Sequence, residues 1–154
     1  MPKQDFFSFL LYASRARYFG RLAYFILKFH GTEIPRNVRI GSGVTLEHGG
    51  ACVVIHRNST IGDRVKIYPG VTLGRADVYR PIGESAFEAI SIGDDVVLGS
   101  GAKVLGKEGV LNVGNGTVIG ANAVLIASTG ENEIWSGIPA RKVGMREDFG
   151  KGRD

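Results

Sequence analysis

The sequence predicts a β-solenoid, in which short strands stack into one column, preceded by a helical segment. Two observations carry this prediction. An aliphatic residue, usually followed by Gly, recurs every six residues, with a small or β-branched residue four places after it. The three residues between these positions are rich in Gly, Asp, Asn, Ser and Pro, which turn a chain. Seven such hexads begin at Ile40, Ile61, Ile67, Ile92, Leu98, Val113 and Ile119.

Each hexad has a direct physical interpretation as a short strand followed by a corner. Successive side chains of a strand alternate between its two faces, so the fifth residue of one hexad and the first residue of the next point the same way. These are the small and aliphatic residues, and we expect both to face inward. A strand of this length is unstable alone, so successive coils must stack and bury a continuous column of Ile, Val and Leu.

The first expected element is an amphipathic helix over residues 5–30. Polar side chains recur there at spacings of three, four and seven, at Ser14, Arg17, Arg21 and Lys28, and mark one narrow stripe. The apolar remainder of the helix requires a partner. The same arginines leave no uninterrupted apolar run of the roughly 20 residues that a membrane span needs.

Two partners for this helix stay open. Either the helix packs against the solenoid or a neighbouring subunit, or it lies in a membrane interface. In the second alternative, cations meet anionic head groups while Phe and Tyr lie at the acyl boundary. These cations are Lys3, Arg15, Arg17, Arg21 and Lys28.

The solenoid is expected over residues 33–144, ending in a capping segment, and residues 145–154 are expected to form a tail. Three steps between inward-facing aliphatic residues exceed six residues. The steps that begin at Leu46 and Val104 each span nine residues, and the step that begins at Leu73 spans nineteen. The extra residues must bulge outward as loops, and loops on a rigid scaffold commonly carry binding chemistry.

The composition indicates one globular domain in a reducing compartment. At 154 residues and 44% apolar content, the chain can bury a core of its own. A net charge of +4 is compatible with an anionic partner, such as a phosphorylated cofactor, a membrane surface or nucleic acid. Cys52 is the single cysteine, so no internal disulfide can form, and no secretory signal is apparent. We therefore expect a cytoplasmic protein, located at the inner membrane surface if the helix is interfacial.

Three histidines, His30, His48 and His56, are the candidates for acid–base chemistry. A neutral imidazole is the commonest general base near neutral pH, and His48 lies in a glycine-flanked loop beside the scaffold. Glu33 precedes His48 by fifteen residues, nearly one coil, so its carboxylate can hold one ring N–H and leave the other nitrogen as the base. The alternative is a solvated loop histidine without function.

The other reactive side chains have simpler interpretations. We expect His56 to be a surface turn residue, and His30 to end the helix, where a cation favours the helix dipole. Cys52 lies in a run of Ala, Val and Ile, which is typical of an inert core thiol. His48 and His56 lack a third ligand nearby, so no metal site is expected.

Several segments together resemble the hexapeptide-repeat acyltransferases over residues 33–144. Besides the hexads, these segments are Leu46–Ile55, Ile67–Gly74, Leu98–Gly106 and Ile138–Val143. The nearest branch is similar to serine O-acetyltransferase and to the O-acetyltransferases of capsule and exopolysaccharide synthesis. The resemblance implies a left-handed β-helix, against the right-handed rule for parallel crossovers, and a homotrimer with active sites between subunits.

The resemblance also assigns roles to individual residues. His48 matches the family's catalytic histidine, Glu33 its acidic partner, and Glu47 an acidic neighbour that contacts the acceptor. The implied reaction is direct: His48 takes the proton of an acceptor hydroxyl as its oxygen attacks the thioester of acetyl-CoA. Acetyl-CoA is the expected co-substrate, and no metal is expected. Gly74 is the expected oxyanion donor. The small residues expected along the pantetheine arm are Gly99, Ser100, Gly101, Ala102 and Ala121. The cations expected to bind the phosphates are Lys103, Arg141 and Lys142.

The expected acceptor follows from two departures from the serine enzymes. Those enzymes carry an arginine–histidine pair just before the hexad at Ile92, where this chain has Glu88 and Ala89. They also carry a longer helical N-terminal domain. Both departures favour a hydroxyl of a sugar or glycan precursor, and hence a role in polysaccharide biosynthesis. The polar residues expected to shape the acceptor pocket are Arg75, Tyr79, Arg80 and Glu84.

Three alternatives stay open. The first is a serine O-acetyltransferase, which the overall similarity supports and Ala89 weakens. The second is a non-catalytic β-helix scaffold, against which the presence of His48 counts. The third is nucleic-acid binding, which the basic charge suggests. Acidic corner residues such as Asp63 and Asp94, and the lack of a basic stripe with interleaved aromatics, argue against it, so we expect no nucleic-acid partner.

Overall fold

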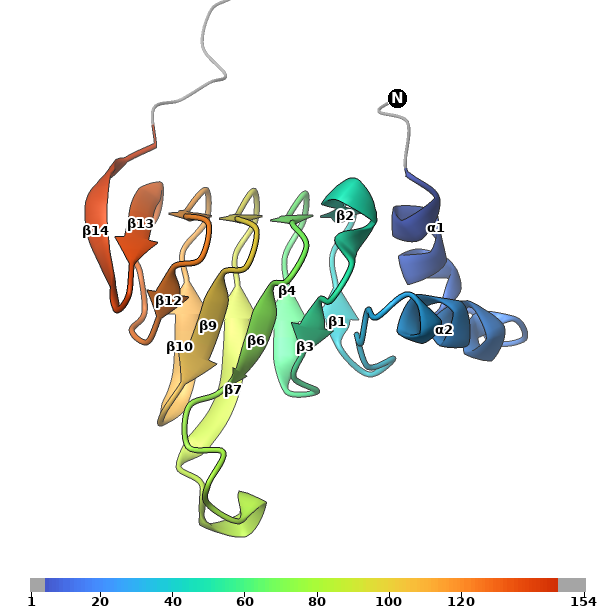
Figure 1. The fold of residues 1–154 in the computed structure, drawn as a ribbon, viewed down its shortest axis with the longest axis horizontal. Coiled ribbons are helices and arrows are strands. Elements are labelled where there is room, and N and C mark those ends of the chain that lie inside the picture. The colour runs from blue at the N-terminus through green and yellow to red at the C-terminus, as the bar shows by residue number, and fades with distance from the viewer. Residues whose placement is uncertain (1–4, 147–154) are drawn as a thin grey trace, which may run out of the picture.

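The structure is a computed structural model that describes residues 5–146 as two helices followed by a three-sided parallel β-helix (Figure 1). One sheet contains β1 (Arg39–Ile40), β4 (Ser59–Ile61), β7 (Phe87–Ile92) and β10 (Gly109–Val113). The second contains β2 (Thr45–Leu46), β5 (Lys66–Ile67), β8 (Val97–Leu98), β11 (Val118–Ile119), β13 (Glu133–Gly137) and β14 (Ala140–Met145). The third contains β3 (Val54–Ile55), β6 (Thr72–Arg75), β9 (Lys103–Gly106) and β12 (Val124–Leu125).

Successive coils are joined in register by parallel ladders. In the second sheet, Leu46 pairs with Ile67, Ile67 pairs with Leu98, and Leu98 pairs with Ile119. Equivalent hexad positions therefore lie directly above one another, which confirms the β-helix predicted from the six-residue period. Stacking of this kind allows every short strand to satisfy its backbone groups on the coils above and below.

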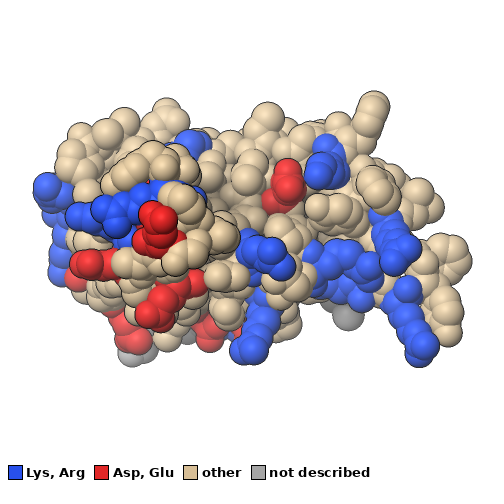
Figure 2. Space-filling model, turned by 90° about the horizontal axis from the view of Figure 1, so that it is seen from below, with Lys and Arg blue, Asp and Glu red and all other residues tan. Residues whose placement is uncertain are grey.

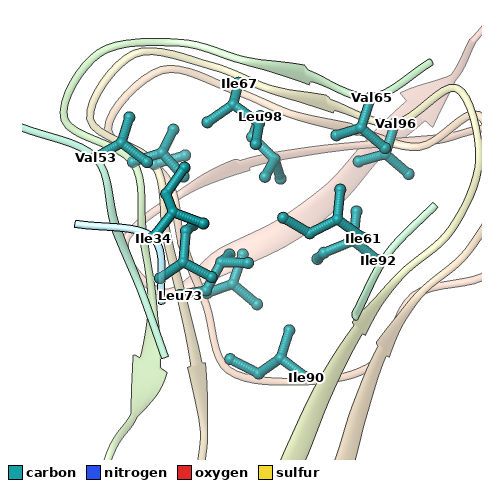
Figure 3. Close-up of a cluster of buried hydrophobic side chains, with 14 of the residues drawn as sticks. Ile34, Val53, Ile61, Val65, Ile67, Leu73, Ile90, Ile92, Val96 and Leu98 are labelled. Carbon is teal, nitrogen blue, oxygen red and sulfur yellow. The ribbon is translucent and has the colours of Figure 1, made fainter. Parts of the chain in front are cut away.

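The core is one column of aliphatic side chains along the axis of the β-helix. Each short strand has two inward positions, the fifth residue of one hexad and the first residue of the next. From Val44 and Leu46 to Ala123 and Leu125, the residues at both positions are buried. Figure 3 shows side chains converging on this column from all three sheets, among them Ile61, Ile67 and Leu73. The inward orientation expected for the first and fifth hexad positions is thus correct.

Glycine serves two separate purposes at the corners, and the sequence pattern suggested only one of them. Gly101 has a φ of +72°, which residues with a β-carbon rarely adopt. Gly62, at the second position of its hexad, is required for another reason: a β-carbon there would lie 2.7 Å from the carbonyl carbon of Gly93. The second hexad glycine therefore permits the close approach of successive coils.

The three long steps of the sequence take three different forms (Figure 1). The step after β2 becomes a tight turn, η1 (Glu47–Gly50). The step after Val104 lengthens β9 and β10, which pair along their whole length with β6 and β7 of the preceding coil. The nineteen-residue step after Leu73 lengthens β6 and β7 and joins them through a loop that contains η2 (Ile82–Glu84) and projects beyond the coils.

The helix predicted over residues 5–30 is two helices, α1 (Phe6–Ala13) and α2 (Gly20–Phe29), separated by a turn. Ser14, expected on the polar stripe, is buried in this turn, where its hydroxyl donates to the Leu11 carbonyl at 2.7 Å. Leu10, Leu11 and Leu27 join the core, so one face of the helices packs against the first coil. Within residues 5–146, no helix is long and apolar enough to cross a membrane.

The C-terminal hairpin closes the stack. β13 and β14 pair in antiparallel fashion, and β13 pairs in parallel with β11, so that Trp135 lies opposite Ile119. The capping segment expected at the C-terminal end of the solenoid is therefore this hairpin. The tail expected at residues 145–154 lies mostly outside the described residues, and Lys3 does as well.

Candidate active site

His48 lies in the turn η1, between β2 and β3. His48, Gly49 and Gly50 have φ angles of 51°, 81° and 61°, so three left-handed residues in succession reverse the chain. Glycine adopts this conformation readily, whereas a histidine adopts it uncommonly. The imidazole is exposed, and its ring centroid lies 5.8 Å from that of Tyr68 on the next coil. The turn thus presents His48 to solvent while both glycines are buried.

The N-terminal segment supports this turn from beneath. The Thr32 hydroxyl donates to the carbonyl of Gly50 at 2.7 Å in a buried hydrogen bond. Phe7 and His30 stack with their ring centroids 4.1 Å apart, and a β-carbon at Gly49 would lie within 3.3 Å of both side chains. His30 ends α2, as expected, and it also packs beneath the turn, which the sequence did not reveal.

Two hydrogen bonds fix the residues that precede the imidazole. The backbone N–H of Leu46 donates to the buried Ser8 hydroxyl of α1 at 2.9 Å. The Thr45 hydroxyl donates to Glu47 Oε1 at 2.7 Å, which holds this half-buried carboxylate beside the turn. Glu47 is therefore next to His48 in space as well as in sequence.

Glu33 lies one coil from His48, but its carboxylate has another partner. The Glu33 N–H donates to the carbonyl of Val53 at 2.7 Å, and Glu33 forms a parallel bridge with Val54, just beyond the His48 turn. Its side chain is 49% exposed, and Oε1 lies 3.8 Å from Nζ of Lys28 in the last turn of α2. No hydrogen bond joins Glu33 to His48 within residues 5–146, so the structure does not form the expected pair.

The loop after β6 brings together only part of the expected acceptor site. Arg75 Nη2 donates to the carbonyl of Arg80 at 2.7 Å, and Nη1 lies 3.8 Å from Asp77 Oδ1. These two facing atoms are buried and have no hydrogen-bond partner in the described part of the chain. The Arg80 guanidinium lies 5.7 Å from the Tyr79 ring centroid, and Tyr79 and Glu84 are exposed. Asp77 is the member of this group that the sequence did not indicate.

His56 is not the surface turn residue that the sequence suggested. It is half-buried, packs edge-to-face on Phe87 with centroids 5.0 Å apart, and accepts the N–H of Asn58 at Nδ1. Burial, together with the nearby cations Arg75 and Arg57, lowers the pKa of His56. The reason is tertiary: Phe87 belongs to the far end of the nineteen-residue step, and no spacing in the sequence places it over this corner.

Cys52 is also misplaced by the sequence argument. It is exposed and has a φ of +58°, while its neighbour Val53 occupies the inward position. The expectation of an inert core thiol is therefore wrong. The turn η1 shifts the alternation of the apolar run, so that the thiol falls on a corner.

The small residues expected to line the cofactor groove lie on neighbouring coils, with one exception. A β-carbon at Gly99 would lie 2.8 Å from the backbone nitrogen of Ala121, and both Ser100 and Ala121 are exposed. Ala102 is fully buried at an inward hexad position, so its side chain cannot line a groove. Gly74 lies within the ladder between β6 and β9.

The cations expected to meet cofactor phosphates have different partners. Lys103 Nζ donates to the carbonyl of Gly70 at 2.5 Å. Lys142 Nζ lies 2.8 Å from Glu133 Oε1, and this contact, with further hydrogen bonds, lowers the pKa of Glu133 to about 2. Arg141 is exposed and donates to the adjacent carbonyl of Ala140. Of the three cations, only Lys142 has a carboxylate partner within the described residues.

The two halves of the expected site do not meet within one chain. The His48 turn lies beside β2 and the helices, whereas the loop after β6 projects from the opposite side of the β-helix (Figure 1). No cluster of three His, Cys, Asp or Glu side chains that could hold a metal ion occurs over residues 5–146. The imidazole of His48 is exposed on a supported turn, so a substrate bound at this surface could give its proton to the imidazole.

Sequence comparison finds relatives among the serine acetyltransferases. The chain is 40% identical over 123 residues to the serine acetyltransferase of Helicobacter pylori. The aligned residues cover 79% of this chain and 65% of the relative. The chain is 34% identical over 117 residues to the serine acetyltransferase of Mycobacterium tuberculosis, which covers 76% and 47%. The chain thus spans about half to two thirds of these relatives. No family model matches the sequence.

Solved structures agree with this finding. The serine acetyltransferase of Brucella abortus in complex with coenzyme A matches with a TM-score of 0.69 at 31% identity, over 83% of this chain and 49% of that one. The Neisseria gonorrhoeae serine acetyltransferase in complex with serine matches with a TM-score of 0.66 at 28% identity, over 80% and 48%. With its stacked hexads and these relatives, the chain has a left-handed β-helix fold and is similar in sequence and structure to the serine acetyltransferases, which are hexapeptide-repeat acyltransferases.

Proposed function

We propose that this chain is an acetyl-CoA-dependent O-acetyltransferase whose acceptor is the hydroxyl of L-serine. The observation that carries the proposal is the exposed imidazole of His48, held on a turn whose glycines are buried. The relatives are serine acetyltransferases, and they favour serine over the sugar acceptor expected from the sequence. They give no support to a role in polysaccharide biosynthesis.

His48 acts as the general base in a direct transfer. It takes the proton of the acceptor hydroxyl while the hydroxyl oxygen attacks the thioester carbonyl carbon of acetyl-CoA. The tetrahedral intermediate then expels the thiolate, which takes the proton back from the imidazolium and leaves as free CoA. Both substrates are bound together, so the reaction gains from proximity and needs no acyl-enzyme.

Glu33 acts as the positioning residue for the base. Its carboxylate is half-exposed and lies one coil away, and its contact with Lys28 spans 3.8 Å between Oε1 and Nζ. An exposed ion pair of this length contributes little free energy, so the carboxylate can turn toward the imidazole at low cost. There it would hold one ring N–H and keep the other nitrogen basic.

A homotrimer completes the site. The turn that carries His48 and the loop after β6 lie on opposite sides of the β-helix, so one chain does not bring the loop residues to its own imidazole (Figure 1). In the proposed assembly, the loop of one subunit covers the His48 turn of its neighbour. Arg75 and Arg80 then bind the carboxylate of the acceptor, a role that suits a guanidinium.

Acetyl-CoA is the proposed co-substrate, with its pantetheine arm along the corner formed by Gly99, Ser100 and Ala121. Ser100 and Ala121 are exposed, and Gly99 lets their two coils approach closely, because a β-carbon there would lie 2.8 Å from the Ala121 nitrogen. Arg141 is the better placed cation for a phosphate group, because Lys142 already has the carboxylate of Glu133 as a partner. The residues proposed with lesser support are Gly74, Gly101 and Lys103.

A sugar hydroxyl is the second candidate acceptor, and one observation favours it. Ala89, which stands where the serine enzymes carry their second histidine, is half-buried in β7 opposite Val110. No imidazole occupies this place, so one expected contact to an amino-acid acceptor is missing. The half-buried His56 lies at the base of the same loop but packs on Phe87.

Thiol release from acetyl-CoA tests the proposal. The full chain is assayed with L-serine and with a panel of sugars, alongside His48→Ala and Glu33→Gln. His56→Ala serves as the matched histidine control. We expect serine-dependent release that falls about 100- to 10,000-fold in His48→Ala, less in Glu33→Gln, and little in His56→Ala.

The possible results separate the candidates. Release with a sugar but not with serine would replace the acceptor and keep the mechanism. Equal activity of wild type and His48→Ala would overturn the mechanism. No release with any acceptor, from a chain whose circular dichroism shows it to be folded, would favour a non-catalytic scaffold.

A further inference from the structure

The two N-terminal helices and the turn between them expose eight large apolar side chains. We call these residues the aromatic face: Phe6, Phe9, Tyr18, Phe19, Leu22, Phe25, Ile26 and Phe29. Five of the eight are Phe, and Phe29 is 97% exposed. Scattered single apolar residues on a surface are ordinary, but this many on two short consecutive helices indicate a binding surface.

The spacing within α2 shows that the exposure is built into the helix. Gly20, Ala23 and Leu27 form a stripe that is buried against the rest of the chain. A second apolar stripe, Leu22, Phe25, Ile26 and Phe29, has the helical spacing of three and four and points to solvent. A helix that served only to cover the first coil would carry polar residues there.

The charged side chains of the two helices themselves have one sign, and the acids Asp5 and Glu33 flank them in the sequence. Of these two acids, Glu33 pairs with Lys28, with 3.8 Å between Oε1 and Nζ. Residues 6–32 contain no Asp or Glu, whereas Arg17, Arg21 and Lys28 are all exposed. In Figure 2, the end of the molecule that carries the helices shows blue cations and no red acid. Most of the acids on this side of the molecule lie toward the other end. Lys28 also lines a shallow hollow with Phe25 and Phe29.

These charges argue against a second copy of the same face as the partner. Two copies would bring Arg17 and Arg21 toward their own equivalents, with no carboxylate in residues 6–32 to neutralise them. An anionic bilayer complements both features, because its phosphate groups attract the arginines and its interface accommodates aromatic rings. The helices are too short to span it, so the contact is peripheral.

We propose that the aromatic face binds the surface of an anionic lipid bilayer, with α2 lying parallel to the membrane plane. The exposed stripe of α2 enters the interface, and Arg17 and Arg21 meet the head groups. Each basic residue near such a surface is attracted to the anionic lipids, and each exposed ring adds the free energy of apolar burial. The inference does not depend on the acceptor or on catalysis.

Vesicle co-sedimentation of the full chain tests this proposal. The probes are vesicles of phosphatidylcholine alone and vesicles containing 30% phosphatidylglycerol, both at about 0.1 M salt, where surface charges are partly screened. Three double variants are compared with wild type: Phe25→Gln/Phe29→Gln, Arg17→Glu/Arg21→Glu, and the control Ile126→Gln/Met145→Gln. The control residues are exposed apolar residues outside the aromatic face.

We expect wild type and the control to bind anionic vesicles at least about tenfold more tightly than neutral ones, and both face variants to lose at least about tenfold. Thiol release from acetyl-CoA in solution should not change in these variants. Absence of wild-type binding, or equal binding by all variants, would overturn the proposal. So would dissociation of the oligomer by Phe25→Gln/Phe29→Gln in light scattering, because the face would then lie between subunits.

Discussion

Asp94 Oδ1 accepts a hydrogen bond from the backbone N–H of Asp63, one coil earlier, at 2.8 Å. The contact recurs along the same corner. Asp63 Oδ1 accepts the N–H of Ser42 at 2.7 Å, and Asn115 Oδ1 accepts the N–H of Asp94 at 2.8 Å. All four residues follow a hexad glycine, and the side chains of Asp63, Asp94 and Asn115 form a ladder that joins four coils.

This ladder predicts the effect of removing one side chain. Asp94→Ala should lower the free energy of unfolding by about 1 kcal/mol, because the Asp63 N–H loses its acceptor. Asp94→Asn keeps Oδ1 and should cost less. Ser100→Ala changes the equivalent hexad position, where no side-chain hydrogen bond occurs within the described residues, and is the control. Urea denaturation measures all three, and equal losses in Asp94→Ala and Ser100→Ala would contradict the ladder.

Glu133 predicts how the cap responds to acid. Its hydrogen bonds with Lys142, Trp135 and Gly130 lower its pKa from 4.5 to about 2. Because the folded pKa is depressed, the stabilisation is fully present above about pH 4.5 and is lost as the pH falls toward 2. Glu133→Gln should therefore reduce stability at pH 7 and flatten the decline between these values. Urea unfolding at several pH values measures both effects, and an unchanged acid slope in the variant would refute the assignment.

Gly62 predicts a steric limit on the stacking of coils. A β-carbon there would lie 2.7 Å from the Gly93 carbonyl carbon and 2.8 Å from the Asp94 nitrogen, and neither backbone can move without shifting a ladder. Gly62→Ala should cost about 1–3 kcal/mol, as overpacking usually does. Gly83→Ala, in open space on the projecting loop, is the matched control and should be nearly neutral. Thermal or urea unfolding of the two variants should differ clearly.

The period of the sequence predicts the core because side-chain direction within a hexad depends only on local alternation. Leu46, Ile67 and Leu98 stack as expected for this reason. The same local rule fails at Cys52, because the turn η1 inserts left-handed residues that change which neighbour points inward. Inward positions are thus predictable within a hexad, and less so across an insertion.

The candidate site was predictable where one turn carries it and less so where distant segments meet. His48 could be identified from its glycine-flanked loop, and it lies exposed on that turn. The Lys28 partner of Glu33 depends on where α2 ends relative to the first coil, and the Phe87 contact of His56 depends on a nineteen-residue step. No short spacing in the sequence encodes either contact.

Cys52 provides a direct chemical test of the corner that the sequence misplaced. The thiol is exposed on a left-handed turn residue, whereas a core thiol would react only after unfolding. In the folded chain, one thiol should react with Ellman's reagent at a rate within about tenfold of the rate in denaturant, because access rather than thiolate formation distinguishes the two states. Cys52→Ser should abolish the signal. Protection by several orders of magnitude in the native protein would place the thiol in a core or in a subunit interface, and would contradict an open corner at this position.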